Sequence, residues 1–163
     1  MTALQLGRIG NALSGIVLVA IFVGSFIVEP QLIARLTAKY GPTFNVRAAL
    51  VFVRGVVLLG TPAVLAVERL LTSLREVLAS VAIGDPFAAA NVARFRAIGW
   101  MLLVLQLVDL ALGGATWLAR STGFEMLDWQ PSFTGWFAVL VAFVLVRVFA
   151  AGTVLRDDLA GTV

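Results

Sequence analysis

The chain has 163 residues, of which 61% are hydrophobic and only 13% are charged, and its mean hydropathy is +1.02. These values lie outside the range of soluble globular domains and are typical of an integral membrane protein. The net charge of +3 excludes a basic nucleic-acid-binding surface. The chain contains no Cys and no His, which removes disulfides, thiolate nucleophiles, imidazole bases and the usual zinc, haem and copper ligands. We therefore expect no enzyme activity, no cofactor and no metal.

The first uncharged stretch covers residues 9–28. As a helix it would rise roughly 30 Å, which matches the hydrocarbon thickness of a bilayer. It is longer than a signal-peptide core and no convincing cleavage site follows, so we expect this helix to be retained. Glu29 and Pro30 end it, and the segment up to Arg47 has the spacing of a short interfacial amphipathic helix.

A second apolar stretch covers residues 48–67 and is interrupted only by Arg54. Thr43 or Asn45 can cap it. Apolar residues continue at i, i+3, i+4 and i+7 spacing past this stretch. We therefore predict one helix from about Val46 to Ile83 that extends beyond the bilayer.

A helix-to-helix turn is predicted directly after this long helix. Gly84 suits the residue that ends a helix, and Asp85 followed by Pro86 suits an N-cap and a first helical position. The helix predicted to start at Pro86 leads into a third apolar stretch at residues 97–119, which Asp109 alone interrupts.

A fourth apolar stretch covers about residues 132–150. We expect one all-α domain over residues 1–163, an integral membrane four-helix bundle in which spans two, three and four extend into the cytoplasm. Lys and Arg are more numerous on the side of the two chain ends, which favours both termini in the cytoplasm. The inner residues are Arg8, Arg69, Arg75, Arg94, Arg96, Arg147 and Arg156, and the outer ones are Arg35, Lys39, Arg47 and Arg120.

An apolar stripe follows the predicted extension of span two. We expect an upright stalk that buries this stripe against the third and fourth helices, and the alternative is a hairpin that leans onto the membrane. The stripe includes Leu70, Leu74, Val77, Leu78 and Val81, and its expected counterparts are Val92, Phe95 and Phe149.

Arg54 and Asp109 are charges inside spans two and three, where an unpaired charge costs on the order of a few kcal/mol. Their heights in the bilayer differ by less than the reach of an arginine side chain, so we predict a buried ion pair between antiparallel helices. The alternative is a proton or cation relay with Asp109 as carrier. The side chain of Arg147 is expected to extend to the cytoplasmic membrane interface. Alternatively, Arg147 contacts Asp109 as well, which would form an anion site.

Two motifs carry a family resemblance. The first is Gly84-Asp85-Pro86-Phe87, then Asn91, then Arg94-Phe95-Arg96-Ala97-Ile98-Gly99-Trp100. The second runs from Phe149-Ala150-Ala151-Gly152 through Thr153-Val154-Leu155-Arg156-Asp157-Asp158 and closes with Gly161-Thr162-Val163. Both resemble a bacterial membrane-protein family, domain of unknown function 2975. The resemblance implies four transmembrane helices in the bacterial inner membrane, no established activity and, from relatives encoded beside helix-turn-helix regulators, a role in membrane signalling.

The turn after span two is the candidate docking site. Helix termination and capping alone can account for the residues of this turn. The functional interpretation is that the turn docks a cytoplasmic protein in an interaction or signalling role. The alternative function is a small transporter or a lipid- or small-molecule-binding bundle that uses Arg54, Asp109 and Arg147. The expected partners are the lipid bilayer and a cytoplasmic protein, without direct nucleic-acid binding, and homo-oligomer formation stays open. The candidate docking residues are Gly84, Asp85, Pro86, Phe87, Asn91, Arg94 and Arg96, of which the two arginines also suit lipid-headgroup anchoring.

Overall fold

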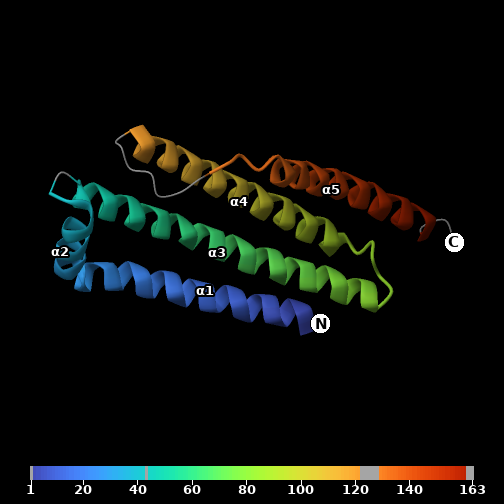
Figure 1. Cartoon of the computed structure of the whole chain (residues 1–163). Coiled ribbons are helices and arrows are strands. Elements are labelled where there is room, and N and C mark those ends of the chain that lie inside the picture. Colours follow the sequence, from blue (N-terminus) through green and yellow to red (C-terminus); the bar gives the residue numbers. More distant parts are fainter. Residues whose placement is uncertain (1, 43, 122–128, 161–163) are drawn as a thin grey trace.

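The computed structural model describes residues 2–42, 44–121 and 129–160 (Figure 1), and within these ranges every regular element is a helix. The expected all-α class is therefore confirmed. The helices are α1 (Thr2–Ile27), α2 (Glu29–Tyr40), α3 (Val46–Ala82), α4 (Ala89–Ser121) and α5 (Phe133–Ala160).

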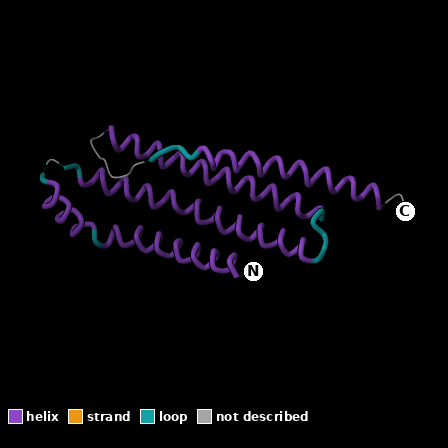
Figure 2. Tube along the Cα trace, turned by 45° about the vertical axis from the view of Figure 1, so that its right-hand side comes forward, coloured by secondary structure: helices purple, strands orange, loops and turns teal. Residues whose placement is uncertain are grey.

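The four long helices lie side by side in the order α1, α3, α4, α5, and both views show the same order (Figures 1 and 2). Extensive contacts join α1 to α3, α3 to α4, and α4 to α5, while the short α2 contacts α3. Consecutive long helices run in opposite directions. The start of α1, the α3–α4 turn and the end of α5 therefore lie at one end of the array, and α2 lies at the other (Figure 1).

Helices α1, α3, α4 and α5 are each long and apolar enough to cross a membrane. Each of the four predicted spans coincides, to within a residue, with part of one of these helices. Large apolar side chains remain exposed along their outer faces, and in the most apolar part of α1 none of the residues is buried. Exposed apolar faces of this size are favourable against lipid and unfavourable in water, so the chain is a multi-pass membrane protein.

Helix α3 is the longest element, and the prediction of a single helix from about Val46 is confirmed. Its N-cap is Asn45, whose side chain accepts a hydrogen bond of 3.1 Å from the backbone N–H of Ala48. Pro62 lies inside this helix, which is continuous through it. Its 37 residues rise about 55 Å, which exceeds the thickness of the hydrocarbon region.

The apolar stripe on the extension of α3 is only partly covered. Leu78 and Val81 are 51% and 48% exposed, so the prediction that they are buried in a stalk is wrong. Val77 of the same stripe is buried as predicted, together with Ser73 and Ser80. Two of these side chains are small, and small side chains let α4 approach closely, which moves the larger leucine and valine side chains to the outside.

The α3–α4 turn begins as predicted and then differs from the prediction. Gly84 has a φ of +84°, a left-handed conformation that favours glycine and ends α3. The backbone N–H of Ala88 then donates to the carbonyl oxygen of Asp85, and α4 begins only at Ala89. The prediction that the next helix starts at Pro86 is therefore wrong. The sequence Asp-Pro also suits a reverse turn, and residues 85–88 form such a turn before α4 begins.

Candidate functional site

The centre of the α3–α4 turn is the side chain of Asn91, which is 0% exposed. Its Nδ2 donates to Ser80 Oγ at 2.5 Å and to the carbonyl oxygen of Pro86 at 3.0 Å. Its Oδ1 accepts from Arg94 Nη1 at 2.8 Å, and Arg94 Nε donates to Glu76 at 3.1 Å. Because a buried amide must keep its hydrogen bonds, Asn91 fixes the positions of α3, the turn and α4 relative to one another.

Phe87 extends this connection to α5. Its ring lies over Gly152, where an added Cβ would come within 2.7 Å of a ring carbon, so only glycine permits this approach. The ring of Phe149 lies between Phe87 and Phe95, with centroid separations of 5.6 Å and 4.3 Å. Thr153 Oγ1 donates to the carbonyl oxygen of Phe87 at 3.2 Å. Aromatic packing and one hydrogen bond therefore hold the turn against α5.

Asp85 and Arg156 form an ion pair between the turn and the last turns of α5. Both side chains are nearly half exposed, so the pair adds little to stability. The two sequence motifs are thus parts of one structure. We call it the α3–α4 clamp, and it consists of Asp85, Phe87, Asn91, Phe149, Gly152, Thr153 and Arg156.

The clamp divides the predicted docking residues into two groups. Asn91 is buried and Arg94 is bound by Glu76 and Asn91, so these two residues position the turn and offer little to a partner. Asp85 and Pro86 are half-buried, whereas Gly84, Phe87 and Arg96 are exposed. A residue that the sequence analysis did not single out as a docking residue, Ile83, is 83% exposed at the same turn.

Arg54 lies at the opposite end of the array and does not bind Asp109, so the predicted ion pair is wrong. Arg54 Nη2 donates to Glu29 at 2.7 Å and to the carbonyl oxygen of Ser25 at 2.8 Å, and its Nε donates to Ser25 Oγ at 3.0 Å. The guanidinium also lies 3.8 Å from the centroid of the Phe26 ring. The end of α1 and the start of α2 therefore satisfy this arginine.

Asp109 and Arg147 are also in separate places. Asp109 Oδ1 accepts a hydrogen bond of 3.2 Å from the indole N–H of Trp129, whose ring packs directly on Gly113. Arg147 is exposed on α5 and has no partner among the residues that the structure describes. Because Arg54, Asp109 and Arg147 do not converge, the geometry provides no relay between them.

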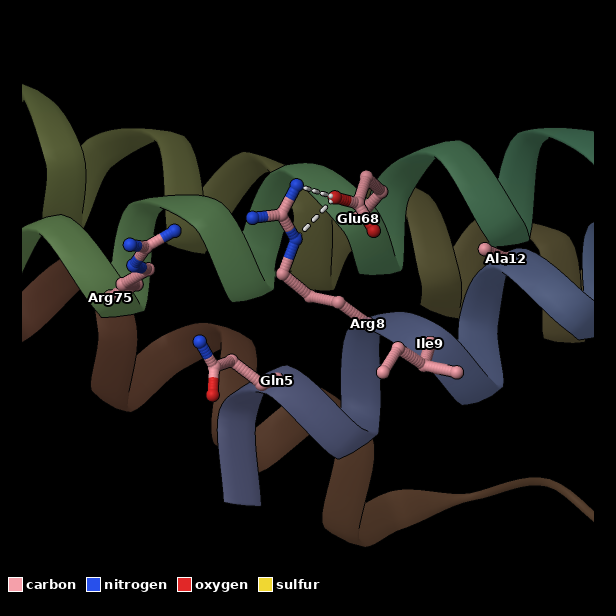
Figure 3. Close-up of a pocket in the computed structure, with 6 residues that line it drawn as sticks. All are labelled: Gln5, Arg8, Ile9, Ala12, Glu68 and Arg75. Carbon is pink, nitrogen blue, oxygen red and sulfur yellow. Dashed lines mark hydrogen bonds and ion pairs between the residues drawn. The ribbon is translucent and has the colours of Figure 1, made fainter. Parts of the chain in front are cut away.

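A groove between α1 and α3 is a feature that the sequence analysis missed. Arg8 contacts Glu68 through Nε and Nη2, each 2.6 Å from the same carboxylate oxygen (Figure 3). Asn11 Nδ2 donates to the carbonyl oxygen of Val64 at 3.0 Å. The groove has a volume of about 490 Å³ and is lined by Gln5, Arg8, Ile9, Ala12, Glu68 and Arg75. Across the described part of the chain, no cluster of three or more acidic residues could hold a metal ion.

These helices and contacts define a four-span helical membrane protein in which a clamp joins the second, third and fourth spans at one end. A family model described as "Protein of unknown function (DUF2975)" matches residues 11–163, and the chain belongs to this family. The resemblance carried by the two motifs is thereby confirmed. No curated protein and no solved structure matches the chain.

Proposed function

We propose that the protein is a non-enzymatic membrane protein whose α3–α4 turn docks a cytoplasmic protein. One observation carries this proposal: apolar side chains are exposed on a turn whose backbone is held rigidly. Ile83 is 83% exposed and Phe87 is 40% exposed, while the buried Asn91 beside them keeps all its hydrogen bonds within the chain.

The rigidity of the turn matters for binding. A partner that docks on a mobile loop must also order that loop, which costs conformational entropy. The clamp has already ordered the turn through Asn91 and Phe87. Binding that buries Ile83, together with the exposed Leu78 and Val81 on α3, would therefore keep most of the hydrophobic gain. This is the arrangement expected of a preformed docking surface.

The distribution of basic residues supports one orientation of the chain in the membrane. Seven arginines lie toward the end of the array that holds the turn, and five basic residues, including Arg54, lie toward the end that holds α2. Cytoplasmic segments carry the excess of Lys and Arg in membrane proteins. We therefore place the turn and both chain ends on the cytoplasmic side of a bacterial inner membrane.

Site-specific photo-crosslinking in native membranes tests the docking proposal. A photoreactive residue at position 83 should give a discrete adduct with one protein, and Ile83→Asp should abolish the adduct formed from a probe at position 81. Ile83 is exposed, so this substitution should leave the fold unchanged. The control is a probe at position 58, because Leu58 is 60% exposed on the apolar part of α3 and should meet only lipid. Identical products from positions 83 and 58 would refute the proposal.

A further inference from the structure

The groove between α1 and α3 has an excess of positive charge. Two arginines and one glutamate line it, so its formal charge is +1. Glu68 binds Arg8, whereas the exposed Arg75 has no partner among the residues that the structure describes. The side chain of Gln5 supplies a further polar group beside these charges. The groove therefore presents a guanidinium that no acidic group of the described chain neutralises.

Polar and apolar groups are separated along the groove. Figure 3 shows Gln5 and Arg75 on one side of the Arg8–Glu68 pair, and Ile9 and Ala12 on the other. The apolar side leads into the middle of α1, whose most apolar part has no buried residue. A ligand in this groove therefore meets charge at one end and continues onto a lipid-exposed helix surface at the other.

We propose that this groove binds the headgroup of an anionic phospholipid. The phosphodiester would lie between Arg75 and Arg8, and Gln5 could donate a further hydrogen bond. Guanidinium groups suit this role because they offer several N–H donors in one plane to phosphate oxygens. An acyl chain would follow Ile9 and Ala12 into the hydrocarbon region. This apolar continuation identifies a lipid, since a soluble phosphate would gain nothing from it.

The test compares lipid binding to two arginine variants of the full chain. Native mass spectrometry would measure how much phosphatidylglycerol and phosphatidylcholine the detergent-solubilised protein retains. Arg75→Gln should reduce retention of phosphatidylglycerol about fivefold, which corresponds to the roughly 1 kcal/mol expected for one arginine near an anionic lipid surface. The control is Arg69→Gln, which removes another exposed arginine of α3 that has no partner among the described residues and lies outside the groove.

The outcomes separate a built site from general surface charge. The proposal requires that phosphatidylglycerol is retained in preference to phosphatidylcholine, and that Arg69→Gln changes retention less than twofold, well below the Arg75→Gln effect. Equal losses in the two variants, or equal retention of the two lipids, would overturn it. Displacement of the lipid by millimolar inorganic phosphate would also overturn it, because the site would then recognise free phosphate. Both variants should keep the unfolding midpoint of the unmodified protein, since neither arginine has a partner among the described residues.

Discussion

Helix α3 packs against α4 on one side and against α1 on the other, and a different asparagine connects it to each of these two helices. On the α4 side, Asn91 is 0% exposed and bonds to α3, to the turn and to Arg94. On the α1 side, the partly buried Asn11 donates to Val64 at 3.0 Å and to Glu68 at 3.4 Å, beside an open groove. An asparagine thus fixes the geometry of one interface and only supports the other. Burial of the amide makes the difference.

The largest difference between the two interfaces is expected when each asparagine is replaced by alanine. Asn91→Ala should lower the free energy of unfolding by about 3 kcal/mol, because it leaves buried polar groups of the turn without partners and opens a cavity. Asn11→Ala should lower it by about 1 kcal/mol or less, because lipid headgroups and water can reach its former partners. Unfolding of the two variants in mixed micelles measures both values. Equal losses would remove the distinction between the two interfaces.

Two glycines sharpen the same comparison. At Gly152 an added methyl group would meet the Phe87 ring at 2.7 Å, whereas at Gly10 nothing lies within 4 Å. Gly152→Ala should destabilise the protein by about 1.5 kcal/mol, because the ring must leave its place against Phe149. Gly10→Ala should be neutral or stabilising by up to about 1 kcal/mol, since alanine favours a helix. The same unfolding measurement applies, and a neutral Gly152→Ala would show that the clamp is loosely packed.

The smallest effect is expected from two exposed ion pairs. Asp85–Arg156 joins the turn to α5, and Arg8–Glu68 joins α1 to α3, with all four side chains between 36% and 48% exposed. Double-mutant cycles should give a coupling of about 0.5 kcal/mol for each pair, because solvent screens exposed charges. A coupling above about 2 kcal/mol at Asp85–Arg156 would mean that charge, and not burial, holds the clamp together.

Length and periodicity predicted most of the fold. Long apolar stretches leave few alternatives to membrane-spanning helices, and the continuing helical spacing predicted the full extent of α3 at Val46–Ala82. Local chemistry also predicted Gly84 as a left-handed residue and Asn45 as one of two candidate caps, of which the other, Thr43, lies outside the described residues. Such features depend on the few residues around them, which is why the sequence determines them.

The partners of the intramembrane charges depended on longer-range geometry. Heights along straight helices predict that Arg54 pairs with Asp109, but α1 ends at Ile27 and the following residues bring Glu29 beside α3. Glu29 is predicted at the same end of the membrane as Arg54, and a search for acidic residues at that end could have identified it as the partner. Asp109 instead binds the neutral donor of Trp129, a partner that a search restricted to opposite charges omits.

The clamp and the groove were only partly accessible from the sequence. Asn91 was recognised as part of a motif, but its burial depends on the close approach of α3 and α4 at Ser80. The groove depends on how α1 is rotated against α3. Apolar residues surround α1 with little preference for one face, so the sequence does not specify which side carries Arg8 toward Glu68.

We expect α3 to cross the bilayer once, with its exposed apolar residues facing lipid within the membrane and solvent beyond it. The chain has no Cys, so single cysteines can report this directly. In sealed vesicles, an impermeant maleimide should label Ile83→Cys from the cytoplasmic side and Lys39→Cys from the opposite side. It should leave Leu58→Cys unlabelled, although Leu58 is 60% exposed in the isolated chain. Labelling of positions 39 and 83 from the same side, or of position 58 as fast as position 83, would contradict the account.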